Sequence, residues 1–135
     1  MISRVIGGIA MLLVLAGAII LSADSLRDRG QLVASIPLAE FQEQLAYGDD
    51  LVLLDIRTEA EAKNEPINLA VDLLIPLQEL PLRKGELIGH YHRTIVALCP
   101  NGQRSREAAR LLRHEGYQAT YLENGLESLD KEAGS

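Results

Sequence analysis

The stretch TIVALCPNGQRSREAARLLRHEG, residues 94–116, changes its periodicity around Cys99, the single cysteine of the chain. Residues 94–98 form a short apolar run rich in β-branched side chains, which is typical of a buried strand. From Ser105 onward the apolar residues share one helical face, and charged residues line the other. Gly116 can end this helix in a left-handed conformation. The sequence therefore predicts that Cys99 lies at the C-terminal tip of a strand, just before a helix.

This position favours a reactive thiol. A helix N-terminus presents unpaired N–H groups and a partial positive charge, and a short loop containing glycine can turn its amides inward around an anion. We therefore expect the Cys99 thiol, with Arg104 close by, to ionise more readily than a free thiol. The alternative is an inert cysteine of the core, but Asn101, Gln103 and Arg104 make an unlikely wall for a core pocket.

Three segments resemble the rhodanese-like family of sulfurtransferases. LCPNGQRSREAARLLRHEGYQATYLENGL is similar to the active-site half of that family, in which a cysteine begins a six-residue loop and a helix follows. LVLLDIRTEAE, with Asp55, Arg57 and Glu61, is similar to an earlier family segment, and residues 75–77 match its Ile-Pro-Leu step. The resemblance covers roughly residues 35–130.

The resemblance implies the fold class, an α/β rhodanese-like three-layer domain with a mostly parallel central sheet, over residues 35–131. The pattern of the chain agrees, because strands and helices alternate in it and such alternation favours layers around a parallel sheet. The apolar run 51–54 is typical of a central parallel strand.

The resemblance also implies an activity. Cys99 would attack a small sulfur-containing anion such as thiosulfate, carry its sulfur as a persulfide, and pass it to a thiol or protein acceptor. Ping-pong kinetics are expected of such a covalent exchange. Arg104 is the candidate for steering the anion, and Ser105 is expected to cap the helix and to hydrogen-bond the persulfide. The substrate-binding residues implied are Pro100, Asn101, Gly102, Gln103, Arg104 and Ser105.

The length of the loop separates this activity from that of a related family. Cysteine-dependent phosphatases use the spacing Cys-x5-Arg, whereas Cys99 and Arg104 enclose only four residues. The shorter loop resembles that of sulfurtransferases, so phosphatase chemistry is the less favoured interpretation.

Asp55 and Arg57 end the apolar run 51–54, at the edge of the sheet where ligands gather. We assign them supporting positions at the site. The interpretation that we favour for both is structural, with Asp55 accepting backbone hydrogen bonds and bracing neighbouring loops.

Two features depart from the family pattern. The segment 63–74 lacks the His and the Gly-Ala turn that relatives usually carry, and Pro100 removes one N–H donor from the loop. The missing turn and the weak cationic character of the loop favour an alternative function, a non-catalytic membrane-tethered module for docking or redox sensing. The cysteine and the six-residue loop argue for the enzyme, since a docking module needs neither.

No cofactor and no metal are predicted. His90 and His92 could share one face of a strand, but no Cys or carboxylate accompanies them in a ligand pattern, and zinc needs three or four ligands. The net charge of −6 and the pI near 5.0 give no reason to expect nucleic acid binding.

The N-terminal segment predicts a membrane attachment. Residues 5–21 contain no charged side chain, and with Ser22 and Ala23 they approach the length of a membrane span, about 20 residues. A cleaved signal peptide is the alternative, but its small-x-small site is badly placed here. We expect an uncleaved single-pass anchor over residues 1–23, in the membrane through residues 5–22, and a linker over 24–34. The arginine counts on the two sides tie, and we favour an exported, periplasmic domain.

Overall fold

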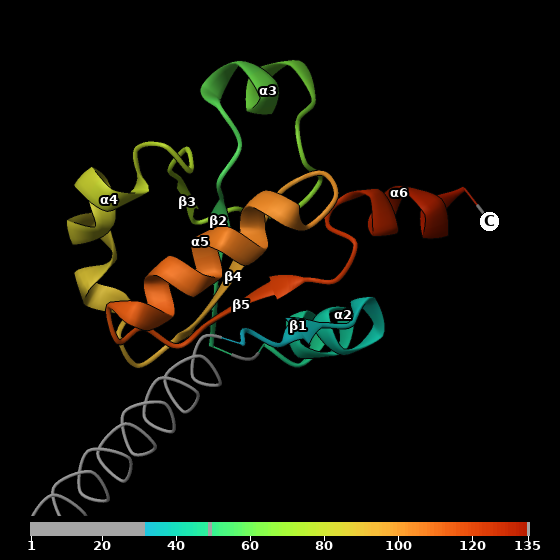
Figure 1. Cartoon of the computed structure of the whole chain (residues 1–135). Coiled ribbons are helices and arrows are strands. Elements are labelled where there is room, and N and C mark those ends of the chain that lie inside the picture. Colours follow the sequence, from blue (N-terminus) through green and yellow to red (C-terminus); the bar gives the residue numbers. More distant parts are fainter. Residues whose placement is uncertain (1–31, 49, 135) are drawn as a thin grey trace, which may run out of the picture. The chain divides into compact units, whose positions relative to one another are not determined.

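The computed structural model describes residues 32–48 and 50–134, which alternate between strands and helices (Figure 1). In order these are β1 (Ser35–Ile36), α2 (Leu38–Tyr47), β2 (Leu51–Asp55), α3 (Glu59–Asn64), β3 (Leu73–Leu74), α4 (Leu80–Arg83), the 3-10 helix η1 (Lys84–His90), β4 (Thr94–Leu98), α5 (Gln103–His114), β5 (Ala119–Leu122) and α6 (Glu127–Ala133). The predicted anchor, residues 1–23, lies outside the described residues, as does most of the linker 24–34. Within the described ranges no helix has both the length and the apolar character that a membrane crossing needs.

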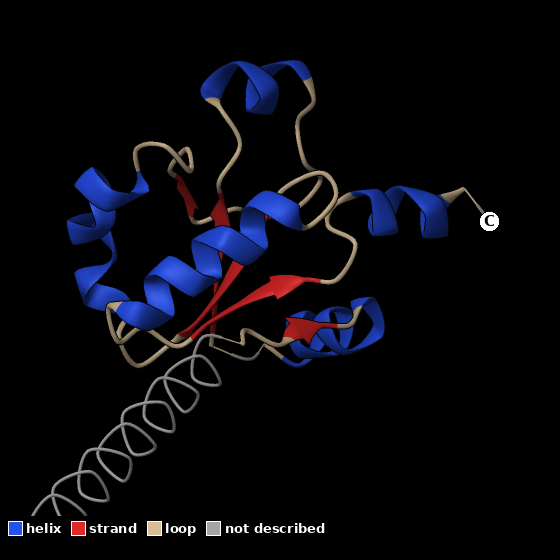
Figure 2. Ribbon diagram, viewed as in Figure 1, coloured by secondary structure: helices blue, strands red, loops and turns tan. Residues whose placement is uncertain are grey.

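The five strands form one sheet in the order β1-β5-β4-β2-β3, and every neighbouring pair is parallel (Figure 2). This confirms the predicted α/β class and the parallel sheet. All five residues of β2 are buried, as its continuous apolar run predicts. In the register of β2 against β4, Asp55 is the partner of Leu98. The carboxyl ends of these two interior strands therefore meet at the same edge, where Cys99 follows β4.

Alternation along the interior strands divides the core into two layers, one on each face of the sheet. One hydrophobic cluster contains Val52, Leu54, Ile95 and Ala97 together with residues of α5. The other contains the intervening strand residues together with residues of α2 and the start of α6. Successive side chains of a strand point to opposite faces, so helices cover both sides of the sheet. This is the predicted three-layer arrangement.

The helix after the cysteine begins earlier than predicted. Helix α5 starts at Gln103, and the residue that precedes it as N-cap is Gly102, in a left-handed conformation with φ of 86°. The prediction that Ser105 caps this helix is wrong, because Ser105 already lies in its first turn. At the other end Gly116 has φ of 92°, which confirms the predicted left-handed terminus.

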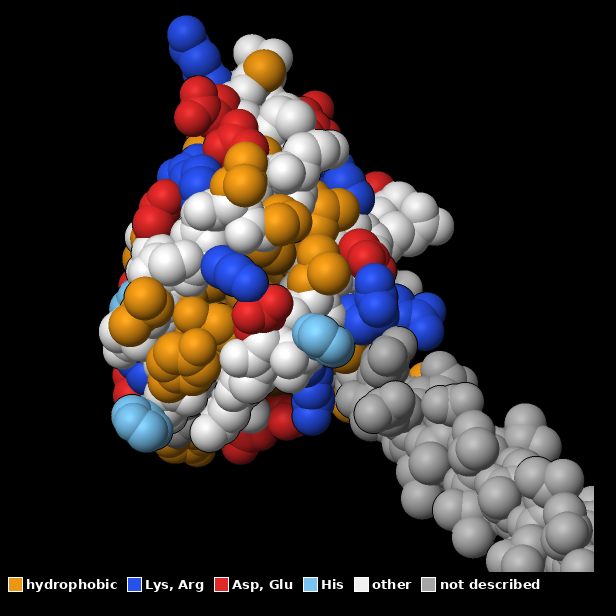
Figure 3. Space-filling view, turned by 60° about the vertical axis from the view of Figure 1, so that its left-hand side comes forward, with side chains coloured by type: hydrophobic (Ala, Val, Ile, Leu, Met, Phe, Trp, Pro, Cys, Tyr) orange, Lys and Arg blue, Asp and Glu red, His pale blue; other side chains and the backbone are white. Residues whose placement is uncertain are grey.

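The connection before β4 is helical, formed by α4 and η1, and His90 and His92 lie at its end, outside any strand. This connection carries two of the most exposed apolar side chains of the described residues, Leu82 and Ile88. Figure 3 views the molecule with this side turned forward, and hydrophobic, acidic and basic side chains are interspersed over it.

Phe41 is the only phenylalanine of the chain, and it is fully buried under the sheet from α2. We expect Phe41→Ala to lower the free energy of unfolding by about 3–5 kcal/mol, because the cavity cannot be refilled by the surrounding aliphatic side chains. Tyr47→Ala, on the same helix at an 80% exposed position, is the matched control and should change it little. Denaturant titration of both variants measures the difference, and equal losses would contradict this account of the core.

Candidate active site

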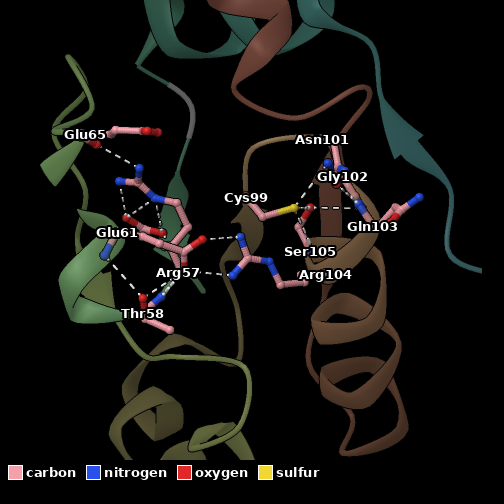
Figure 4. Close-up of polar contacts among 11 residues, drawn as sticks. Arg57, Thr58, Glu61, Glu65, Cys99, Asn101, Gly102, Gln103, Arg104 and Ser105 are labelled. Carbon is pink, nitrogen blue, oxygen red and sulfur yellow. Dashed lines mark hydrogen bonds and ion pairs between the residues drawn. The ribbon is translucent and has the colours of Figure 1, made fainter. Parts of the chain in front are cut away.

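Cys99 is fully buried, and its sulfur lies where β4 ends and α5 begins (Figure 4). Two backbone amides donate to Sγ, that of Gly102 at 3.1 Å and that of Ser105 at 3.3 Å. The hydroxyl oxygen of Ser105 lies 3.2 Å from the same sulfur. These groups converge on the sulfur as donors converge on an anion, because the first amides of a helix have no partner within it.

The Ser105 hydroxyl can serve both protonation states of the cysteine. The hydroxyl donates a hydrogen bond to the carbonyl oxygen of Gly102, with 3.1 Å between the two oxygen atoms. A neutral Cys99 thiol can then donate its own proton to the Ser105 oxygen. When the sulfur is a thiolate or persulfide, rotation of the hydroxyl turns that proton toward the sulfur instead.

Only some of the backbone N–H groups in the loop point toward the Cys99 sulfur. The Gln103 N–H donates to the side-chain oxygen of Asn101 at 3.1 Å, and Pro100 has no N–H to offer. Of residues 100–105, the ones that donate a backbone N–H to the sulfur are therefore Gly102 and Ser105. The sequence predicted that the amides of the loop in general turn inward, whereas in the structure two of them donate to the sulfur.

A turn before α6 holds the loop from behind. The Leu126 N–H donates to the carbonyl of Cys99, and the Glu127 N–H donates to the carbonyl of Pro100, both at 2.9 Å. A Cβ atom on Gly125 would lie 2.3 Å from the Cys99 carbonyl oxygen and 2.5 Å from that of Pro100, so only glycine fits here. This role of Gly125 was not predicted, although the Asn-Gly pair that precedes Leu126 indicates a turn.

Asp55 and Arg57 form a buried ion pair at the neighbouring strand end, with side chains 4% and 3% exposed. The Asp55 carboxylate accepts the backbone N–H of Arg57 and three hydrogen bonds from its guanidinium. Arg57 also donates to the carbonyl of Glu65 at 2.8 Å, beyond the end of α3. This is the bracing arrangement favoured for Asp55, and Arg57 shares it.

Arg104 does not stand alone beside the cysteine. Its guanidinium donates to both carboxylate oxygens of Glu61 in α3, at 2.9 and 2.7 Å, as Figure 4 shows. These hydrogen bonds, followed by those from Thr58, hold the pKa of Glu61 well below its usual range. The hydrogen bonds between Arg104 and Glu61 also raise the pKa of Arg104, with smaller contributions from the nearby Cys99 and Asp55. Glu61 was noted only for its resemblance to a family position, and its pairing with Arg104 was not predicted.

Among residues 32–48 and 50–134, no three His, Cys, Asp or Glu side chains gather where they could hold a metal ion.

Comparison with known proteins gives consistent results. The family described as "Rhodanese-like domain" matches residues 38–132. A protein of Allochromatium vinosum named "Sulfurtransferase" is 34% identical over 86 residues, which are 64% of this chain and 77% of the relative.

Solved structures agree with this match. A rhodanese-related protein from Thermoplasma volcanium is similar with a TM-score of 0.62 and 26% identity, over 73% of this chain and 91% of the other. A rhodanese homologue from Thermus thermophilus is similar with a TM-score of 0.55 and 30% identity, over 70% of this chain and 99% of the other. With its parallel sheet and the cysteine loop at the carboxyl edge, this chain belongs to the rhodanese-like domain family.

Proposed function

We propose that the protein is a sulfurtransferase that carries sulfane sulfur on Cys99. The observation that supports this most is the pair of amides, from Gly102 and Ser105, directed at the sulfur. Hydrogen-bond donors fixed at the position where negative charge resides stabilise that charge without reorganisation. A thiolate carries its negative charge on this sulfur, and a persulfide carries its charge on the outer sulfur bonded to it.

In the first half-reaction the donor is thiosulfate or a similar anion. The Cys99 thiolate attacks the outer sulfur, a new S–S bond forms to Sγ, and the original S–S bond breaks. The bonding electrons leave with sulfite, and the enzyme holds the persulfide anion. No oxidant or reductant is consumed, because the thiosulfate itself supplies sulfur at the required oxidation state.

In the second half-reaction an acceptor removes the outer sulfur. An acceptor thiol bonds to it, the S–S bond to Cys99 breaks, and the acceptor's proton passes to the Cys99 sulfur. The acceptor leaves as a persulfide anion, and Cys99 is left as a thiol, which returns to the attacking thiolate by releasing its proton to solvent. The order of events is that of covalent catalysis in two steps.

Arg104 is proposed to assist the donor, but its charge is balanced by Glu61. The pair is partly exposed, with side chains 33% and 39% accessible, so solvent screens it and an arriving anion can reach the guanidinium. The backbone amides therefore remain the principal donors in this proposal.

The central test is turnover by the full-length chain in mild detergent, followed as sulfite release from thiosulfate with cyanide as acceptor. We expect parallel double-reciprocal lines, a loss of more than about a thousandfold in Cys99→Ser, and a loss of about tenfold in Ser105→Ala. Thermal melting shows whether each variant is folded. A folded wild-type chain that releases no sulfite would favour the docking or redox-sensing module instead.

Glu61→Gln tests the ion pair through the pH dependence of stability. The pKa of Glu61 is lowered on folding, so its ion pair with Arg104 stabilises the folded state fully when the pH is above the usual carboxyl pKa of 4.5. This contribution to stability is lost as the pH falls below that value. The wild type should melt higher than Glu61→Gln above about pH 5, and the gap should narrow in acid. Gln preserves an acceptor for Thr58, and Glu43→Gln controls for the loss of a surface carboxylate. A gap that is constant or widens in acid would contradict this role.

We also propose that residues 5–22 attach the chain to a membrane by a single span, with the domain on the exported side. The support is the uncharged apolar stretch 5–21, long enough for a span with its neighbours. The chain should stay in membranes washed with alkaline carbonate, and protease added outside the inner membrane should digest the domain. Release by carbonate, or protection until the membrane is lysed, would contradict the anchor or its orientation respectively.

A further inference from the structure

A pocket of about 440 Å³ lies next to the cysteine loop, between the chain that follows α3 and helix α6. Its apolar wall is supplied by Ile67 and Leu69 on one side, by Leu126 and Leu129 on the other, and by Pro100 from the loop itself. The volume falls within the range of ligand pockets and far exceeds what a thiosulfate ion fills. The segment 63–74, which departs most from the family pattern, thus lines this pocket.

The charge around the pocket is acidic. Glu65, Glu127 and Asp130 line it, and within the described ranges neither Glu127 nor Asp130 takes part in a salt bridge. The one basic residue among the lining, Arg57, is 3% exposed and neutralised by Asp55. A cationic occupant is therefore attracted and a small anion repelled.

The pocket is joined to the nucleophile through the backbone. Leu126 and Glu127, both in its lining, donate their N–H groups to the carbonyls of Cys99 and Pro100. Pro100, which also lines the pocket, directly follows Cys99 in the chain, so an occupant that lies against Leu126 and Pro100 contacts the cysteine loop itself. This adjacency suits a molecule that must present a thiol to the persulfide.

We propose that this pocket receives the sulfur acceptor, and that the acceptor is a cysteine in a basic, partly apolar segment of a partner protein. The inference rests on the proposed sulfur transfer and specifies its second half-reaction. The apolar wall takes the side chains beside the acceptor cysteine, and the three carboxylates take its cationic neighbours. The donor, a small anion, uses the loop amides and not the pocket.

The test uses the full-length chain loaded with thiosulfate and freed of excess donor. Two thiol peptides, Lys-Leu-Cys-Leu-Lys and Glu-Leu-Cys-Leu-Glu, are offered as acceptors, and intact mass follows the loss of sulfur from the protein. Each rate is divided by the rate of the same peptide with a small disulfide, which removes differences in thiol reactivity. At low salt we expect the basic peptide to react about tenfold faster, and 0.5 M salt to reduce this preference.

The variant Glu127→Gln/Asp130→Asn removes two carboxylates from the pocket, and Glu40→Gln/Glu43→Gln removes two from α2 as the matched control. We expect the tenfold preference to fall to about twofold in the first variant and to persist in the second. Loading with thiosulfate should not be slower in either variant, because the loop amides that receive the donor are untouched. Equal rates for the two wild-type peptides, or equal losses in the two variants, would overturn the inference.

A second readout does not depend on persulfide formation. The peptide Lys-Leu-Ser-Leu-Lys should shift the backbone amide signals of α6 in NMR spectra of the full-length chain, and the acidic analogue should not. If Cys99 fails to load but α6 responds to the basic peptide, the sulfur transfer is wrong and the pocket stands. If Cys99 loads and neither peptide perturbs α6, the acceptor inference alone fails.

Discussion

The hydrogen bonds that Gly102 and Ser105 donate to the sulfur of Cys99 are the interaction on which the rest of this site depends. They exist because a parallel strand ends and a helix begins within a few residues, which leaves helix amides without backbone partners at the place where the sulfur lies. The left-handed Gly102 makes that short passage possible. Burial of the sulfur then excludes water, which strengthens each hydrogen bond to it.

Three other parts of the chain hold this arrangement from different sides. The turn at Gly125 accepts close approach of the loop and fixes the carbonyls of Cys99 and Pro100 by hydrogen bonds, and the Asp55–Arg57 pair braces the neighbouring strand end. Glu61 ties Arg104 to α3. Breaking the buried pair would leave a charge without a partner in a dry environment, which is costly, whereas the exposed pair with Arg104 can open at little cost. The backbone around the Cys99 sulfur is therefore held rigidly, whereas the Arg104 side chain can change its position.

Much of the fold follows from patterns that act over a few residues. The apolar runs 51–54 and 94–98 predict β2 and β4, and the helical face after Ser105 predicts α5, because burial on both faces or on one face leaves a distinct period. The start of α5 was predicted too late, because the N-cap residue is Gly102, which has no side chain of the kind that marks a helix N-terminus in a sequence. Segment 63–74 carries no periodic signal, so the wall that it builds beside the loop could not be predicted.

The candidate site was predictable where one segment contains it and not where distant segments meet. Cys99 and its loop are contiguous in sequence, so their geometry follows from the strand and the helix. Glu61 and Gly125 reach the same place through tertiary contacts, and a single sequence gives no measure of such distances.

The measurement that tests the central claim most directly is the intact mass of the full-length chain after exposure to thiosulfate or inorganic polysulfide without an acceptor. We predict a gain of one sulfur atom, located on Cys99, removed by cyanide and absent from Cys99→Ser; a folded chain whose mass is unchanged by both donors would contradict the account.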